Sequence, residues 1–129
     1  MCGIVGIASN NNCIPALLLG LQALEYRGYD SSGIASSIHN HLTHKKSIGK
    51  ISNLIDKLNN EELQGNTAIA HTRWATHGKP TLVNAHPFVK ENCALVHNGI
   101  IENHEELINI YSLNRKNIQS ETDTEVIAE

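Results

Sequence analysis

Residues 1–8 read MCGIVGIA, with a cysteine in second position followed by six small or apolar residues. The run over residues 3–8 contains β-branched side chains and predicts a buried strand. Glycine weakens a strand, so Gly3 and Gly6 indicate that other backbone approaches closely there. Cys2 is therefore expected at the first residue of a rigid, buried strand.

This position gives Cys2 a chemistry that the other two cysteines lack. Removal of Met1 would leave a free α-amino group on the residue that carries the thiol. The ordinary pKa of that amine is about 7.7–8, so it can act as the base for its own nucleophile. An isolated cysteine is more often a small buried hydrophobe, and it is the strand setting that favours a nucleophile. Cys13, where a helical pattern begins, and Cys93, in an apolar strand, are expected to be structural.

Helical and strand patterns alternate irregularly along the rest of the chain, which predicts the α+β class. Helices are predicted over residues 14–26, 51–58 and 103–111. Further strands are predicted over residues 33–38, 67–72 and 93–97. Residues 39–46 are expected to be a hairpin tip, and residues 73–87 a long loop. Thr122 and Glu125 have capping-box spacing, which predicts a last helix beginning at Glu125.

The composition excludes several classes of protein. The chain has 129 residues, 40% of them hydrophobic, which is enough for one domain. Its formal charge of -3 argues against nucleic-acid binding. No segment approaches the roughly 20 apolar residues of a membrane span, and no secretory signal begins the chain. Three cysteines without a disulfide pattern fit a cytoplasmic protein. Because the last helix has room for only about one turn, we expect a fragment of a larger domain.

The segment His97-Asn98-Gly99 follows a predicted strand and has two interpretations. Asn-Gly is a strong turn signal in any protein. An acyl-transfer site needs donors directed at a developing oxyanion, and an asparagine amide with a backbone N–H provides them. With a candidate nucleophile at Cys2, the two interpretations have equal weight.

Residues 71–78 (HTRWATHG) contain candidate substrate-binding groups. The planar guanidinium of Arg73 matches a carboxylate, and Asp123 can complement an ammonium group. Trp74 is either a core aromatic or part of a loop that closes over a ligand. The eight histidines raise the question of a metal. The chain has no CxxC or HExxH, however, and the polar cluster His39, His41 and His44 is typical of solvated side chains, so no metal site is expected.

Six blocks of sequence resemble the glutaminase domain of the glutamine–fructose-6-phosphate aminotransferases, which are N-terminal-nucleophile amidotransferases. The blocks are MCGIVGIA (1–8), LEYRGYDSSGIA (24–35), AHTRWATHGKP (70–80), NAHPF (84–88), HNGIIENHEEL (97–107) and SETDTEVIAE (120–129). The initial CG and the HNG are shared with related amidotransferases of purine, asparagine and glutamate synthesis. The longer blocks are more specific to the aminotransferase branch.

The resemblance implies a role for each site residue. Cys2 is the nucleophile and its own amine the base, and Asn98 with the N–H of Gly99 forms the oxyanion hole. Arg73 holds the α-carboxylate of glutamine and Asp123 its α-ammonium. Trp74 lies on a loop that closes over glutamine and gates ammonia in the whole enzyme. The pocket is further shaped by Thr76, His77 and His86. Neither a metal nor an organic cofactor is implied.

The resemblance also implies a fold and a reaction. The fold is the four-layer αββα sandwich of N-terminal-nucleophile hydrolases, of which residues 1–129 supply only the N-terminal part, without the sugar isomerase domains. The reaction is hydrolysis of glutamine, with the ammonia used elsewhere in a homo-oligomeric enzyme to convert fructose 6-phosphate to glucosamine 6-phosphate in amino-sugar (hexosamine) biosynthesis. The alternatives are an inactive product of a split or decaying gene, a non-catalytic glutamine-binding or interaction fragment, and an amidotransferase with another acceptor.

Overall fold

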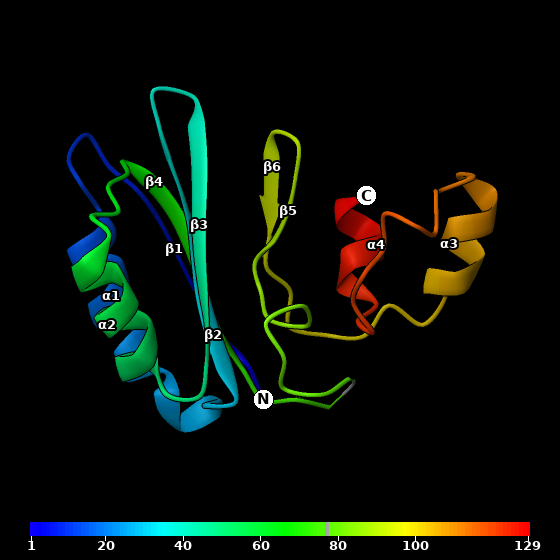
Figure 1. The fold of residues 1–129 in the computed structure, drawn as a ribbon, viewed down its shortest axis with the longest axis horizontal. Helices are drawn as coiled ribbons and strands as arrows, with labels where there is room; N and C mark the ends of the chain where they lie inside the picture. Colours follow the sequence, from blue (N-terminus) through cyan, green and yellow to red (C-terminus); the bar gives the residue numbers. More distant parts are fainter. Residues whose placement is uncertain (77) are drawn as a thin grey trace.

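A computed structural model describes residues 1–76 and 78–129, which form four successive layers (Figure 1). Helices α1 and α2 cover one face of a four-stranded sheet; the hairpin β5–β6 lies against the other face, and α4 and α3 lie beyond it. The strands are β1 (Gly3–Ala8), β2 (Ser31–Ile38), β3 (His41–Ile48), β4 (Thr67–Arg73), β5 (Phe88–Lys90) and β6 (Cys93–Leu95). The helices are α1 (Ile14–Ala23), α2 (Ile51–Asn60), α3 (His104–Ile110) and α4 (Thr124–Ala128), with a 3-10 turn at Glu25–Arg27. The predicted α+β class and the αββα layering are both confirmed.

The main core lies between the two N-terminal helices and the four-stranded sheet. Apolar residues at helical spacing give α1 and α2 one buried face each. Leu17 and Leu21 of α1 and Leu54 of α2 are fully buried against Ile34 and Ala70 of the sheet. Burial of each leucine contributes about 1.5–3 kcal/mol. This cluster makes the sheet a rigid platform for residues at its ends.

The sheet is antiparallel, with strand order β1-β4-β2-β3. In this order β4 is an inner strand, and Gly3 of β1 lies opposite Thr72 of β4. The prediction that other backbone approaches Gly3 and Gly6 is wrong, because the nearest atoms to a Cβ at these positions belong to the side chains of Leu24 (2.7 Å) and Ile69 (3.8 Å). A Cβ at Gly33 of β2 would come within 2.0 Å of the carbonyl oxygen of His86. Glycine is therefore required where the loop before β5 crosses the sheet. The loop that carries His86 is thereby held close to the end of β4.

Two local predictions differ from the structure in the hairpin and strand regions. Residues 41–48 form strand β3, so the predicted tip shrinks to His39 and Asn40, whose φ angles are 49° and 61°. Strand β3 pairs only with β2, and the polar side chains that argued against a strand are tolerated at this sheet edge. Cys93 was expected to be structural, but it begins β6 with an exposed side chain. Cys13, by contrast, is buried in the core cluster as expected.

The predicted last helix is present, but it begins one residue earlier than predicted and Glu125 makes other bonds than those of a capping box. Helix α4 begins at Thr124, and its first residue is preceded by Asp123 without a side-chain capping bond. The Glu125 carboxylate instead accepts from the backbone N–H groups of Gln119 and Ser120. In the part of the chain that the structure describes, no helix is long and apolar enough to cross a membrane.

Candidate active site

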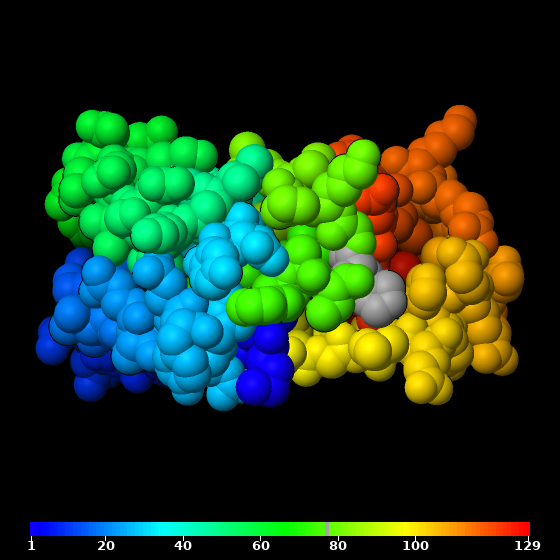
Figure 2. All heavy atoms as spheres, turned by 90° about the horizontal axis from the view of Figure 1, so that it is seen from below, coloured from blue at the N-terminus to red at the C-terminus, as the bar shows by residue number. Residues whose placement is uncertain are grey.

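A cavity of about 80 Å³ collects candidate residues from both ends of the chain. It lies where β1 begins and β4 ends, next to the loop after β6 and the start of α4. At the surface, the N-terminal residues touch the segment that follows β4 and the segment near residue 100 (Figure 2). The cavity is lined by Met1, Cys2, Arg73, Trp74, Thr76, His86, His97, Asn98, Gly99, Thr122, Asp123 and Thr124. Of the predicted site residues, His77 lies outside the described residues, and all the others line this cavity.

Cys2 lies immediately before β1, which is a strand as predicted. The prediction of a buried strand is wrong, because β1 is an outer strand of the sheet and, of its six residues, Gly3 alone is buried. The side chain of Cys2 is half-buried, and its Sγ lies 3.9 Å from the carbonyl oxygen of Trp74. The next N–H, that of Gly3, donates to Thr72 Oγ1 at 3.2 Å and so fixes the strand start to β4. Met1 precedes Cys2 and is 74% exposed. Removal of this exposed residue would leave a free α-amino group on Cys2, the group that the sequence predicts as the base.

Asn98 and Gly99 lie directly beside the cysteine. Asn98 Nδ2 donates to the carbonyl oxygen of Cys2 at 3.3 Å, which joins residues 96 positions apart in the sequence. A Cβ at Gly99 would lie 2.7 Å from His97 Nε2. Glycine therefore lets the turn pack on the His97 ring. The amide of Asn98 therefore contacts the backbone of the residue that the sequence predicts as the nucleophile.

Arg73 lies at the end of β4 with 4% of its surface exposed. Its guanidinium donates to the carbonyl oxygens of Lys79 at 3.0 Å and Gly78 at 3.4 Å. Burial lowers the pKa of Arg73, while attraction from Cys2, Asp30 and Glu121 acts in the opposite direction. A guanidinium near Cys2 can hold a substrate carboxylate and stabilise a thiolate.

Asn84 and Glu121 fix the loop that Arg73 contacts, and their pairing could not be predicted from the sequence. Asn84 is buried and donates to Glu121 Oε2 at 2.9 Å and to the Lys79 carbonyl oxygen at 3.0 Å. It also accepts from the N–H of Glu121 at 2.9 Å. The Asn84 bond lowers the pKa of Glu121, helped by the N–H of Lys79. These bonds connect the loop after β4 to the segment before α4.

Asp123 forms the wall of the cavity opposite the sheet. Its Oδ2 accepts from the N–H of Ile101 at 2.6 Å, and its Oδ1 accepts from the hydroxyl of Thr124 at 3.3 Å. Among the described residues, each oxygen of the carboxylate thus accepts one bond. A carboxylate held in this way retains lone pairs for an ammonium group.

Two buried histidines, His71 and His86, are stacked below the cavity at 4.1 Å between ring centroids. Burial lowers the pKa of His71 to about 4, and burial together with the charge of His71 lowers that of His86 further. Both rings are therefore neutral near pH 7. Neither ring nitrogen of His86 has a hydrogen-bond partner within the described residues.

Trp74 belongs to a loop rather than to the core. It is 45% exposed, and its ring contacts Tyr29 edge-on at 5.8 Å between centroids. Of the two interpretations of this residue, the structure supports a loop aromatic at the cavity mouth. Thr76 lines the same cavity.

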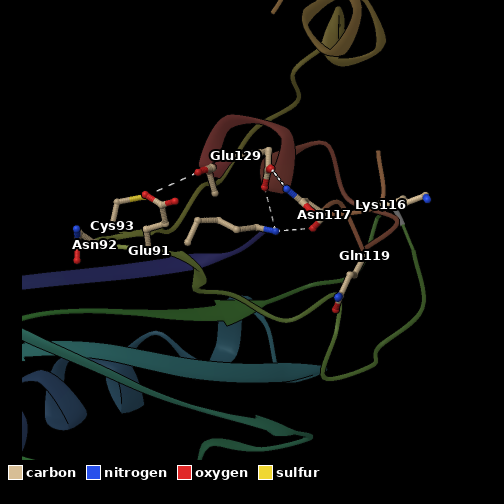
Figure 3. Close-up of a pocket in the computed structure, with 9 residues that line it drawn as sticks. Glu91, Asn92, Cys93, Lys116, Asn117, Gln119 and Glu129 are labelled. Atoms are coloured by element: carbon tan, nitrogen blue, oxygen red, sulfur yellow. Dashed lines mark hydrogen bonds and ion pairs between the residues drawn. The ribbon is translucent and has the colours of Figure 1, made fainter. Parts of the chain in front are cut away.

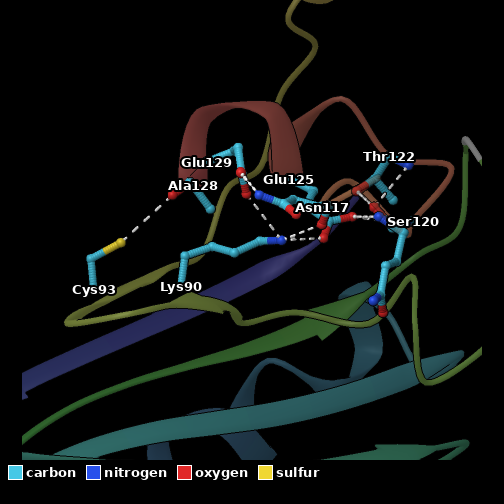
Figure 4. A network of polar contacts seen from close by, with 9 residues as sticks. Lys90, Cys93, Asn117, Ser120, Thr122, Glu125, Ala128 and Glu129 are labelled. Atoms are coloured by element: carbon cyan, nitrogen blue, oxygen red, sulfur yellow. Dashed lines mark hydrogen bonds and ion pairs between the residues drawn. The ribbon is translucent and has the colours of Figure 1, made fainter. Parts of the chain in front are cut away.

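A second, larger hollow of about 620 Å³ lies between the β5–β6 turn and the C-terminal segment (Figure 3). Its lining is mostly charged and polar, and its central feature is Lys90, which pairs with Glu125 at 2.9 Å and Glu129 at 3.3 Å (Figure 4). Glu125 also binds the backbone just before Asp123. This network therefore supports the segment that leads to Asp123, and the candidate active site is the smaller cavity, which contains Cys2.

Comparison with known proteins agrees with this geometry. Residues 56–129 match the family described as "Glutamine amidotransferase domain". The glutamine–fructose-6-phosphate aminotransferase [isomerizing] of Escherichia coli (strain K12) is 51% identical over 129 residues, and that of Wigglesworthia glossinidia brevipalpis is 53% identical over 131 residues. Each match covers 99% of this chain and 21% of the relative, so the chain spans about a fifth of the length of these curated relatives.

Two solved structures share the fold. The glutamine phosphoribosylpyrophosphate amidotransferase of B. subtilis, complexed with ADP and GMP, superposes with a TM-score of 0.81 at 28% identity, over 99% of this chain and 28% of that one. The allosteric regulatory enzyme of purine biosynthesis superposes with a TM-score of 0.83 at the same identity and coverage. Because the family match covers more than half of the chain, this protein belongs to the glutamine amidotransferase family.

Proposed function

We propose that this chain hydrolyses the side-chain amide of glutamine with Cys2 as the nucleophile. The observation that carries the proposal is the meeting of Cys2, Asn98, Arg73 and Asp123 on one cavity from four separate parts of the sequence. These groups supply a nucleophile, an oxyanion donor, a carboxylate partner and an ammonium partner. Binding and hydrolysis of glutamine require all four groups.

In the proposed reaction, the free amine of Cys2 takes the thiol proton and the thiolate attacks the amide carbon. The amide of Asn98 and the N–H of Gly99 stabilise the negative charge on the oxygen. The C–N bond then breaks, ammonia leaves with the proton from the amine, and a thioester remains on Cys2. Water hydrolyses the thioester to glutamate and restores the thiol.

Arg73 and Asp123 select the substrate in this proposal. Arg73 binds the α-carboxylate and Asp123 the α-ammonium, so the side-chain amide is directed towards Cys2. Trp74 covers the bound glutamine, while Thr76, His77 and the neutral His86 complete the pocket wall. No metal or organic cofactor takes part.

We further propose that residues 1–129 are part of the glutaminase domain of a cytoplasmic glutamine–fructose-6-phosphate aminotransferase. The identity of about 50% to these aminotransferases over nearly the whole chain supports fructose 6-phosphate as the acceptor, rather than the acceptors of other amidotransferases. Amination of fructose 6-phosphate, and assembly into a homo-oligomer, belong in this proposal to sugar isomerase domains outside this sequence. The three unpaired cysteines are compatible with a reducing compartment.

Release of glutamate from glutamine tests the proposal. The purified chain, with loss of Met1 verified by intact mass, is expected to form glutamate, and the Cys2→Ala variant is expected to form none. Cys13→Ala and Cys93→Ala serve as controls that leave the site intact. Hydrolysis that persists in Cys2→Ala would overturn the nucleophile, and an inert, folded parent chain would favour the alternative of a non-catalytic fragment.

A further inference from the structure

A continuous series of hydrogen bonds runs from the sheet core to the wall of the cavity. His71 Nε2 on β4 lies 3.1 Å from the carbonyl oxygen of His97, and His97 Nδ1 lies 3.1 Å from Thr124 Oγ1. The Thr124 hydroxyl donates to Asp123 Oδ1 at 3.3 Å. Three separate elements, which are β4, the turn after β6 and the start of α4, are joined by these bonds.

The direction of each bond follows from the available protons. A carbonyl oxygen only accepts, so His71 must carry its proton on Nε2. The other nitrogen, Nδ1, is buried and has no hydrogen-bond partner among residues 1–76 and 78–129. Thr124 has one hydroxyl proton and gives it to Asp123, so it must accept from His97 Nδ1–H. Every proton in the series therefore points from the core towards the Asp123 carboxylate.

The series passes through His97, which immediately precedes the proposed oxyanion donor Asn98. His97 is held at both its carbonyl and its ring, and Asn98, the next residue, reaches the carbonyl of Cys2. Thr124 is 2% exposed and His71 is fully buried, so water has little access to these two side chains, whereas His97 and Asp123 are half-buried and line the cavity. The bonds orient the Asp123 carboxylate and the Asn98 amide relative to one rigid strand.

We propose that Thr124 and His97 are positioning residues that couple the ammonium-binding carboxylate of Asp123 to the oxyanion segment at Asn98. This inference rests on the proposed function, because it assigns Asp123 to the α-ammonium of the substrate. Thr124 acts through Asp123 and does not touch the reacting atoms. Its hydroxyl, and not its volume, is the required feature.

A cycle of two ligands and two variants tests the role of Thr124. Glutamate carries an α-ammonium group, and glutarate has the same carbon chain without it. Thr124→Val keeps the size of the side chain and removes the hydroxyl, while Thr124→Ser keeps the hydroxyl. Titrations followed by NMR are expected to show glutamate binding about tenfold weaker in Thr124→Val, with glutarate binding unchanged. Thr124→Ser is expected to bind both ligands as the parent chain does.

Equal weakening of both ligands in Thr124→Val, or no weakening of glutamate, would overturn the proposal. The ring ¹⁵N signals of the parent chain provide a second readout that needs neither a variant nor activity. They are expected to show a proton on Nδ1 of His97 and on Nε2 of His71, and a ring that lacks its proton at this position would overturn the series of bonds. A parent chain that shows these protons but binds no glutamate would refute the proposed function while leaving the bond series in place.

Discussion

Replacement of Glu125 by glutamine removes one charge from the partly buried network that Glu125 forms with Lys90 and Glu129 (Figure 4). Glu125 is 5% exposed. One of its oxygens accepts from the N–H groups of Gln119 at 2.9 Å and Ser120 at 2.6 Å, and the other lies 2.9 Å from Lys90 Nζ. Glu125→Gln keeps the shape of the side chain. In either orientation of the new amide, its NH₂ group lies against another donor, which is either the ammonium of Lys90 or the backbone N–H groups of Gln119 and Ser120.

The expected loss of stability follows from these contacts. Hydrogen bonds to a charged partner contribute about 1.5–3 kcal/mol each, and loss of one member of a buried ion pair costs about 3–5 kcal/mol. Lys90 keeps Glu129 as a partner, so we expect the lower end, about 3 kcal/mol. For a domain of this size the loss corresponds to a fall in Tm of about 10 °C.

Thermal unfolding followed by circular dichroism measures this effect. The matched control is Glu61→Gln, because Glu61 also pairs with a lysine, Lys45, but its side chain is 64% exposed. Exposed pairs contribute little, so the control is expected to change Tm by less than about 2 °C. Equal Tm values for Glu125→Gln and the parent chain would refute the structural role given to this network.

The pH dependence of the Tm difference between the parent chain and Glu125→Gln tests whether the contacts stabilise the charged form of Glu125. Burial raises the pKa of Glu125, but the N–H of Ser120 and the ammonium of Lys90 outweigh it, so the pKa lies below the ordinary 4.5. The stability from Glu125 is thus fully present above pH 4.5 and is lost as the pH falls through the lowered pKa. The difference in Tm between parent and Glu125→Gln is expected to shrink below pH 4.5. A difference that grows on acidification would contradict the assigned contacts.

Three further substitutions test other parts of the structure. Asn98→Ala is expected to slow glutamine hydrolysis by roughly 10²–10³, as measured by glutamate release, because an oxyanion donor is lost. Gly28→Ala places a Cβ 2.6 Å from the carbonyl carbon of Arg73, so it is expected to lower both the hydrolysis rate and Tm. Gly6→Ala is its control, since the nearest atom to that Cβ is 3.8 Å away. Leu17→Ala, at a fully buried position, is expected to lower the free energy of unfolding by about 3–5 kcal/mol in urea titrations.

The elements that the sequence predicted well are those whose pattern is local. The spacing of apolar residues in α1 and α2 reflects a single buried face, and the short apolar run of β1 is bounded by clear turn signals. Strand β3 was missed because most of its residues are polar, which an edge strand tolerates; β1 lies at the other edge of the sheet, but its residues are apolar. Strand β5 has three residues, too few for any periodicity.

The site shows the same division between local and distant features. Cys2, Asn98 and Arg73 were predicted because each stands in a short motif with a chemical meaning. Thr124 was not, since its bond to His97 joins residues 27 positions apart. The bond between Asn84 and Glu121 spans 37 positions. Contacts of this kind depend on the tertiary fold and leave no pattern in a single sequence.

Covalent labelling tests most directly whether Cys2 is the nucleophile. A glutamine analogue with a diazoketone in place of the amide is incubated with the chain that has lost Met1, and the modified residue is located by peptide mass spectrometry. We predict one adduct, on Cys2, which excess glutamine prevents, and no adduct on Cys93 although its side chain is exposed. Labelling of Cys93 in preference to Cys2, or labelling of Cys2 that glutamine does not prevent, would contradict this account.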